Sequence, residues 1–442
     1  MAPSVELAVA ESTRRRVSRR LVPYLTFIYL LSYLDRANLS VAKLQMQLDL
    51  HFTDAVIGLG AGIFFLGFLL LDIPGSLIVE RFGARKYMSR IMIAWGIVAT
   101  TTGFLGLSVS AHLFHAVSFR AQFYTLRLLL GATEAGFFPG VIIYLSRWFR
   151  AQDRARAMAW FMVAQPVSIA LGVPISRAIL ESIHWRGLTG WHWVFILEGL
   201  PAVFFGVVTR FYLTDRPQDA RWLTAHEKAW LTAELDREAR ERAAQGRVKI
   251  WEGFRSPQTL LLLAIYFLIV NGNQAMIYFL PSITDAMHAL SIAGRTTVAA
   301  LPYALSAVTI LLNGISANRS GERRWHTALP MLIGGCALAC AMLSAGHLAL
   351  VISFYCLAGA TSQAYLPVFW TLPSTYLGKS AAAAAIGLIS FGNLGGFTGP
   401  YIFGALHTRT GNFSTGIFFL SGCMLAAGAL ATLVRATKPH AT

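Results

Sequence analysis

Twelve apolar segments dominate this sequence of 442 residues, each close to the roughly 20 residues that a helix needs to cross a lipid bilayer. We place them at residues 21–42, 56–79, 89–108, 120–146, 157–182, 192–213, 258–282, 294–318, 326–344, 347–376, 379–406 and 411–434. Only 13% of the residues are charged, about half the share typical of soluble domains. The sequence therefore predicts an all-α membrane protein with twelve transmembrane helices, and it excludes a soluble enzyme with one membrane anchor.

The distribution of positive charge predicts the orientation in the membrane. A net charge of +16 would indicate nucleic-acid binding in a soluble protein. Here most of the 37 Lys and Arg residues fall in loops and tails on one side of the predicted helices. This asymmetry follows the positive-inside rule, so we expect a multi-pass protein of the cell (inner) membrane, with both termini cytoplasmic and no nucleic-acid partner. The first apolar run is too long for a cleavable signal, so we expect it to be retained as an anchor.

One charged segment interrupts the apolar pattern. Residues 214–257 have the mixed charge of a solvated loop, and Thr224 and Glu227 have the spacing of a helix-capping box. We expect an amphipathic helix here, lying at the membrane surface between two bundles. The loop divides the predicted helices into six and six. The expected organisation is a cytoplasmic tail (1–20), a first bundle (21–213), the cytoplasmic loop (214–257), a second bundle (258–434) and a cytoplasmic tail (435–442).

Two short loops carry a matching pattern. The loop after the second helix contains Gly83 followed by Ala, Arg and Lys, and the loop after the eighth contains Gly321 followed by Glu, Arg and Arg. Both glycines follow a basic residue by two positions and lie in corresponding places of the two halves. This similarity predicts an internal repeat of six-helix units.

The loop from Ser76 to Lys86 resembles the signature loop of the major facilitator superfamily, with Ser76 in place of its first glycine and Glu80 in place of its aspartate. Three further motifs, within residues 33–40, 127–140 and 191–199, are similar to the anion:cation symporter branch, which moves sugar acids, tartrate or aromatic carboxylates. The resemblance implies two six-helix bundles and alternating access around a central site. It also implies a gating role for the loop charges and their neighbours: Asp72, Glu80, Arg81, Arg85 and Arg319. Asp72 is expected to act as a gate or as a helix-end partner of Arg85 or another loop cation.

Ionisable side chains inside the predicted helices are costly and need a function. Arg127 and Glu134 are two helical turns apart, so both project from one helix face. A guanidinium offers a planar fork to a carboxylate. We therefore expect Arg127, together with Arg36, to bind a substrate carboxylate, and Asp35 and Glu134 to carry protons. The alternative is a permanent Asp35–Arg127 ion pair that locks two helices.

Uncharged polar residues complete the candidate site. The family resemblance favours Gln165 and Asn393 as substrate contacts, and we add Tyr33 and Tyr278, although hydrogen bonding between helices would explain them equally well. The four cysteines show no metal-ligand spacing, so we expect neither a disulfide nor a metal, and no cofactor. Motifs of ATP hydrolysis or proteolysis are absent from the sequence, which indicates that the protein is not an enzyme.

These observations together predict a secondary active transporter for proton-coupled uptake of a small organic anion, working as a monomer in membrane lipid. An exporter or antiporter of amphipathic compounds is the alternative, and it would need an apolar cavity without paired cations and acids. A membrane enzyme would need a cluster of catalytic residues in its loops. A receptor or scaffold would not need buried charges.

Overall fold

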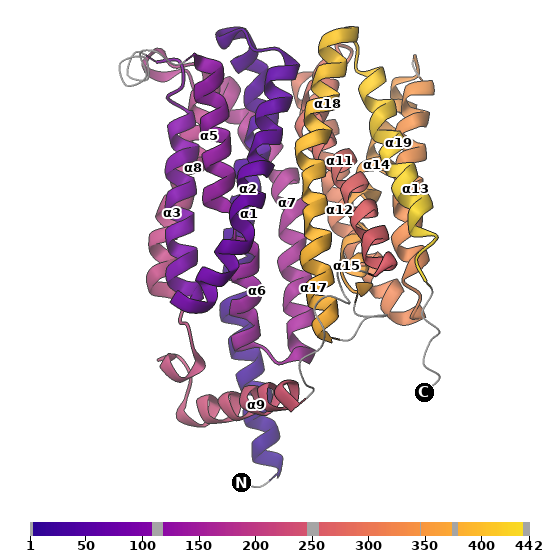
Figure 1. Cartoon of the computed structure of the whole chain (residues 1–442). Coiled ribbons are helices and arrows are strands. Elements are labelled where there is room, and N and C mark those ends of the chain that lie inside the picture. The colour runs from indigo at the N-terminus through magenta and orange to yellow at the C-terminus, as the bar shows by residue number, and fades with distance from the viewer. Residues whose placement is uncertain (1–2, 108–117, 245–255, 345, 374–378, 436–442) are drawn as a thin grey trace.

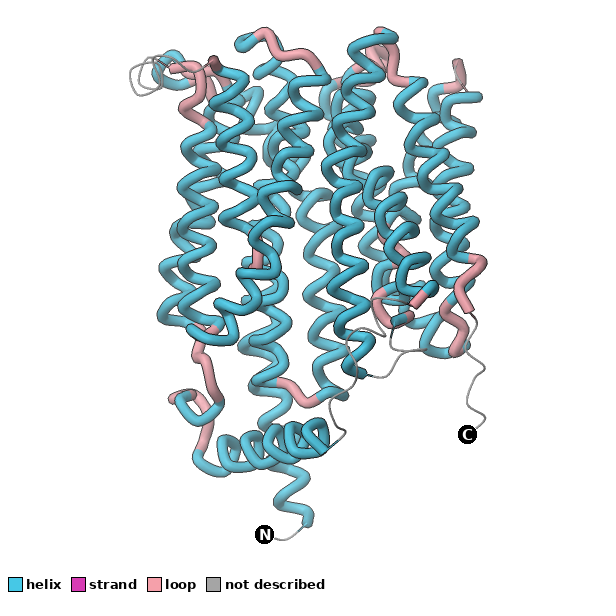
Figure 2. Tube along the Cα trace, viewed as in Figure 1, coloured by secondary structure: helices cyan, strands magenta, loops and turns pink. Residues whose placement is uncertain are grey.

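The computed structural model describes residues 3–107, 118–244, 256–344, 346–373 and 379–435. All regular elements in these ranges are α-helices or short 3₁₀ turns (Figure 2). The helices form two bundles side by side, one from each half of the chain (Figure 1). The predicted all-α fold of two bundles is confirmed.

The first bundle contains α1 (Pro3–Leu50), α2 (Asp54–Phe82), α3 (Ala84–Thr102), α5 (Phe119–Glu134), α6 (Phe137–Trp148), α7 (Ala151–Ser182) and α8 (Gly190–Tyr212). The second contains α11 (Pro257–Asp285), α12 (Ile292–Ser320), α13 (Arg324–Leu343), α14 (Leu348–Ser362), α15 (Leu366–Phe369), α17 (Lys379–Ser390), the 3₁₀ turn η3 (Phe391–Leu394), α18 (Gly395–Thr410) and α19 (Ser414–Ala431). Between the bundles in sequence lies α9 (Ala225–Ala244). We call the side of the molecule that carries α9 the α9 end, and the other side the opposite end (Figure 1).

Nine spans within the described residues are apolar and long enough to cross a membrane. They leave out three of the predicted segments, in α1, α3 and α17–α18. Charged side chains inside α1 and α3 lower their hydropathy, and η3 interrupts the α17–α18 segment. With these nine spans, the protein is an integral membrane protein.

The fourth predicted segment, residues 120–146, is not one continuous helix. It divides into α5 and α6 at Ala135 and Gly136, directly after Glu134. Gly136 has φ +79°, and a Cβ there would lie 2.6 Å from the Tyr87 hydroxyl and 3.1 Å from the Cα of Gly75. Only glycine tolerates both this left-handed conformation and this close packing. The break places Glu134 at the last position of α5.

The turns at Gly83 and Gly321 both lie at the α9 end. Helices α1 and α7 begin next to α9, where ion pairs join them to it, so both run toward the opposite end. There α2 follows α1, and the end of α7 shares a groove, lined by Glu181 and Ile292, with the start of α12. Both α2 and α12 therefore run back to the α9 end, in agreement with the predicted repeat. The side chains of Glu80 and Arg81 lie outside the described part of the structure.

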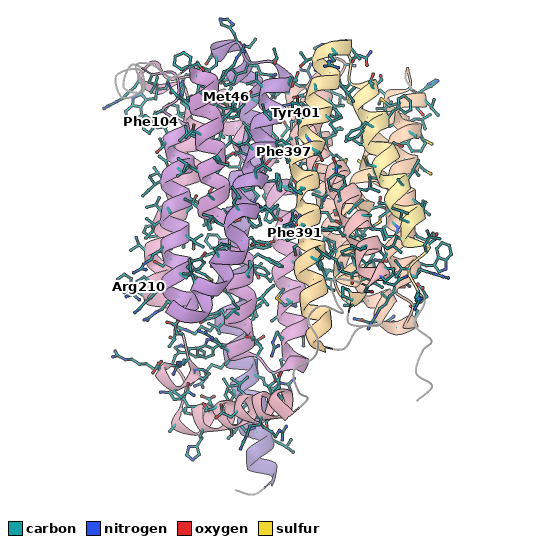
Figure 3. The ribbon with its side chains drawn as sticks, in the orientation of Figure 1. Met46, Phe104, Arg210, Phe391, Phe397 and Tyr401 are labelled. Carbon is teal, nitrogen blue, oxygen red and sulfur yellow. The ribbon has the colours of Figure 1, made fainter. Side chains whose placement is uncertain are left out.

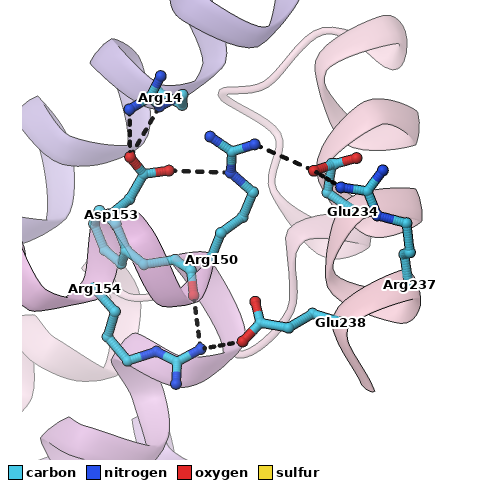
Figure 4. A network of polar contacts seen from close by, with 8 residues as sticks. Arg14, Arg150, Asp153, Arg154, Glu234, Arg237 and Glu238 are labelled. Atoms are coloured by element: carbon cyan, nitrogen blue, oxygen red, sulfur yellow. Dashed lines mark hydrogen bonds and ion pairs between the residues drawn. The ribbon is translucent and has the colours of Figure 1, made fainter. Parts of the chain in front are cut away.

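The capping box predicted in the central loop is confirmed. The backbone N–H of Thr224 donates to Glu227 Oε2 at 2.9 Å, and the backbone N–H of Glu227 donates to Thr224 Oγ1 at 3.3 Å. We expected the following helix between the bundles, but α9 packs beneath the first bundle, against α1 and α6 (Figure 1). Ion pairs hold it there: Arg150–Glu234 and Arg154–Glu238, both at 3.2 Å, join it to α7 (Figure 4).

Contacts between the two bundles concentrate toward the opposite end. The ring of His407 on α18 lies 2.8 Å from Asp54 Oδ2 at the start of α2. One turn further, a Cβ on Gly58 would lie only 2.3 Å from the carbonyl oxygen of Pro400, so glycine permits direct contact of the backbones. Phe397 and Tyr401 continue this seam along α18 (Figure 3). The two bundles are thus closed against each other on this side.

Candidate functional site

A cavity of about 290 Å³ lies between the bundles, on the α9 side of these closing contacts. Its aromatic wall consists of Tyr29, Tyr33, Phe65, Phe68, Phe137, Phe138, Tyr266, Tyr365 and Trp370. Its polar lining consists of Arg36, Asp72, Gln165, Asn273, Gln274, Ser390 and Asn393. Both bundles contribute to it, as a site served by alternating access requires.

The cation on the cavity wall is Arg36, one of the predicted site residues. Its Nε lies 2.9 Å from Glu134 Oε1, and Ser32 donates a hydrogen bond to the same oxygen. The guanidinium carbon lies 4.7 Å from the ring centroid of Tyr33. Within the described part of the chain, no hydrogen bond occupies the two terminal nitrogens of Arg36. The cavity wall therefore carries a guanidinium that is paired with Glu134 through Nε and that can donate hydrogen bonds to a ligand from its terminal nitrogens.

Arg127 lies behind the cavity wall and does not line the cavity. Its Nη2 donates to the hydroxyl of Tyr278 at 3.2 Å and its Nε to the carbonyl of Gly60 at 3.3 Å. Tyr278 belongs to α11, so this contact joins the two bundles. The guanidinium carbons of Arg127 and Arg36 both lie 5.1 Å from the ring centroid of Phe64. Both arginines therefore approach the same ring, and of the two only Arg36 lines the cavity.

Asp35 faces away from the cavity. Trp95 on α3 donates a hydrogen bond to Asp35 Oδ2 at 2.9 Å, and Oδ1 has no hydrogen-bond partner among the described residues. Adjacent helical residues differ by about 100° in direction, and here this rotation turns Asp35 away from the cavity that Arg36 lines. No ion pair joins Asp35 to Arg127 in the described chain, so the structure does not contain the alternative locked pair.

The second bundle contributes neutral polar groups. Asn393, on η3, accepts a hydrogen bond from the hydroxyl of Tyr266 at 3.2 Å. Gln165 faces the cavity from α7 of the first bundle. Asn271 instead accepts a hydrogen bond from Thr398 at 2.7 Å, which joins α11 to α18. Gln165 and Asn393, both candidates from the sequence, therefore line the cavity, whereas Asn271 joins two helices.

The predicted gating residues separate in space. Asp72 lines the cavity, with Oδ1 lacking a hydrogen-bond partner among the described residues. Arg85 does not pair with Asp72 as we expected. Its partner is Asp215, which accepts from the Arg85 backbone N–H at 2.9 Å and lies 3.5 Å from its Nε, because the segment before α9 folds back onto the α2–α3 turn. Arg319 is exposed in the last turn of α12.

Lys43 is a buried charge that we did not single out from the sequence. Its side chain is fully buried, 3.5 Å from Asp54 Oδ1, and its Nζ lies 3.6 Å from the ring centroid of Phe279 on α11. Lys43 follows Arg36 by two helical turns, the same spacing that drew attention to Arg127 and Glu134. It was missed because we ended the first apolar segment at residue 42.

Two helical bundles around a charged, aromatic-lined cavity define a class of membrane protein, the secondary transporters. The Major Facilitator Superfamily profile matches residues 25–400 of this chain. The chain belongs to this superfamily, whose members are transporters and not enzymes.

The chain is similar over nearly its full length to curated transporters. It is 37% identical to a protein of Agrobacterium vitis named "Putative tartrate transporter", covering 97% of this chain and 92% of that protein. It is 34% identical to a "Quinolone resistance transporter" of Acinetobacter baumannii, covering 93% and 92%. Among solved structures, the inward-open xylose transporter XylE of Escherichia coli matches with a TM-score of 0.75 at 16% identity, covering 96% of this chain and 98% of that one.

Proposed function

We propose that the protein imports a small organic anion, such as a sugar acid, a hydroxy diacid or an aromatic carboxylate, together with protons. The observation that carries the proposal is the Arg36 guanidinium on the cavity wall, which Glu134 holds through Nε and whose terminal nitrogens have no hydrogen-bond partner among the described residues. A guanidinium in this arrangement suits a carboxylate, because two parallel hydrogen bonds can form. The aromatic wall would hold the ring or chain of the anion.

Glu134 is the proposed proton carrier. An arriving carboxylate competes with Glu134 for Arg36, and Glu134 would otherwise be left as an unpaired buried charge, which is costly. Taking up a proton removes that cost, so substrate binding and protonation favour each other. Asp35 is a second candidate, since it is 2% exposed and forms no ion pair with any described residue.

Proton coupling also meets the electrical demand of uptake. Moving one negative charge into a cell costs about 2.3 kcal/mol per 100 mV of negative-inside potential, and co-transported protons offset this cost. We propose that the α9 end and both termini are cytoplasmic, in line with the excess of Lys and Arg in the loops there. The conformation then faces the cytoplasm, with the opposite end closed.

Uptake into proteoliposomes tests the proposal. A panel of labelled sugar acids, hydroxy diacids and aromatic acids should include one that accumulates when the outside is made acidic. An uncoupler should abolish that accumulation. Accumulation that is unaffected by the uncoupler, or that needs no pH gradient, would contradict proton coupling.

Export of amphipathic compounds is the second candidate, favoured by the aromatic wall and by the relative named for quinolone resistance. The same vesicles distinguish the two candidates. An exporter would exchange an amphipathic cation or zwitterion for protons and would ignore the carboxylate panel.

A further inference from the structure

A second, larger hollow lies on the first bundle at the α9 end, away from the transport cavity. It measures about 850 Å³ and is formed by the first half of α1, the start of α7 and α9. We call it the interfacial groove. The part toward α9, which we call its charged part, is lined by Arg15, Arg19 and Arg156, and the part further along α1 and α7, its apolar part, by Phe27, Leu30 and Trp160.

Part of the charge in the interfacial groove is already neutralised within the protein. Asp153 accepts from Arg14 and lies 3.1 Å from the Nε of Arg150, so one acid serves two arginines (Figure 4). Arg150 also pairs with Glu234 of α9. The other acid on the lining is Glu11, which is exposed.

Three arginines of the interfacial groove have no acidic partner among the described residues: Arg15, Arg19 and Arg156. All three side chains are exposed. They project from two different helices into one hollow, so they can act on the same ligand. The charged part of the groove therefore concentrates positive charge that no described carboxylate neutralises by an ion pair.

The apolar part of the interfacial groove lies at membrane depth. The apolar span of α7 begins at Arg156, and Trp160, one turn further, is 53% exposed. On α1, Leu30 follows Arg19 by eleven residues, about 16 Å along the helix, which is close to the depth of one leaflet. Phe27 lies between them and is 39% exposed. Arginines at the end of the apolar span, with exposed aromatic side chains deeper in the bilayer, are typical of a membrane–water interface.

We propose that the interfacial groove binds one anionic phospholipid. Its phosphate would sit among Arg15, Arg19 and Arg156, which can form bidentate hydrogen bonds to phosphate oxygens. One acyl chain would extend into the bilayer along Phe27 and Trp160. Basic pockets at the ends of transmembrane helices are suited to such headgroups. A soluble phosphate would contact only the charged part of the groove and would leave the exposed aromatic side chains without a role. A phospholipid would occupy both parts.

Native mass spectrometry of the purified, full-length protein tests this assignment. Phosphatidylglycerol and phosphatidylcholine with identical acyl chains are titrated against the wild type and two triple variants. The test variant carries Arg15→Gln, Arg19→Gln and Arg156→Gln. The control variant carries Arg216→Gln, Arg221→Gln and Arg240→Gln, which removes the same charge from exposed positions at the same end but outside the groove.

We expect the wild type to retain one phosphatidylglycerol in preference to phosphatidylcholine. The test variant should weaken that retention at least about tenfold, and the control variant should leave it unchanged. Trp160→Ala should also reduce it without altering any charge, and this keeps the proposal testable if the triple variant does not fold. Equal retention of both lipids, equal loss in the control, or displacement by glycerol phosphate at equal concentration would overturn the proposal.

Discussion

The two halves of the protein share one architecture but divide the polar chemistry between them. Among the described residues in the membrane-embedded part of the first half, the buried charged side chains are Asp35, Lys43, Arg127, Glu134 and Glu198. Within the described residues of the second half, 256–344, 346–373 and 379–435, the buried polar side chains are all neutral, such as Asn271, Asn273 and Gln363. The fold repeats across the halves, and the charge does not.

This difference suggests separate roles for the halves. Charges in a membrane are expensive and are kept where an ion or proton is handled. Amides and hydroxyls are cheaper, and they can recognise a substrate or join helices. We propose that the first half couples transport to protons and binds the charge of the substrate, whereas the second half contacts its neutral part and moves against the first.

The largest expected effect comes from Glu134→Gln. Without an ionisable group beside Arg36, proton-driven accumulation should be lost, while exchange of substrate across the membrane at equal pH should continue at least in part. Asp35→Asn is compared in the same assay of uptake under a pH gradient. Glu198→Gln is the matched control, because Glu198 is a buried acid bonded to Ser176, outside the cavity. Wild-type accumulation by both Glu134→Gln and Asp35→Asn would show that neither carries the proton.

The next effect concerns the two arginines. Arg36→Lys keeps the charge but loses the planar fork, so apparent substrate affinity should fall by about 1–3 kcal/mol. Arg127→Lys should cost less affinity, because Arg127 does not line the cavity. Concentration dependence of uptake measures both. The reverse order, with affinity lost in Arg127→Lys and kept in Arg36→Lys, would assign the carboxylate to Arg127 instead.

A third change loosens the closed end. Asp54→Asn removes the charge that faces both Lys43 and His407, so the contact of α2 with α18 should weaken. Spin labels on these helices should report a larger population of separated distances at the opposite end. Asp49→Asn is the control, because Asp49 is at the same end but bonds to Trp191 within the first bundle. An unchanged distance distribution in Asp54→Asn would show that this contact does not hold the opposite end closed.

The smallest effect is expected in the second half. Asn393→Ala removes one neutral hydrogen-bonding group, worth about 0.5–1.5 kcal/mol, so apparent affinity should fall by roughly two- to tenfold. The pH dependence of uptake should be the same as in the wild type. Asn412→Ala, in an exposed loop, provides the control. A changed pH dependence in Asn393→Ala would contradict the division of roles between the halves.

Several features could be predicted because they depend on neighbours in sequence. The apolar segments, the capping box at Thr224 and Glu227, and the repeated turns at Gly83 and Gly321 all follow from local composition and spacing. The break after Glu134 was not predicted, although Gly136 was visible. A glycine marks a helix break only when the packing around it demands one, and here Tyr87 and Gly75 supply that demand.

The sequence by itself determined the membrane-spanning class, the two halves and which side chains share a helix face, because helical periodicity sets the angle between residues on one helix. It did not determine how each helix is rotated toward its neighbours. Only the tertiary structure turned Arg36 to the cavity and Asp35 to Trp95, paired Arg36 with Glu134, and joined Arg127 to Tyr278. Those choices depend on the packing of residues far apart in the chain.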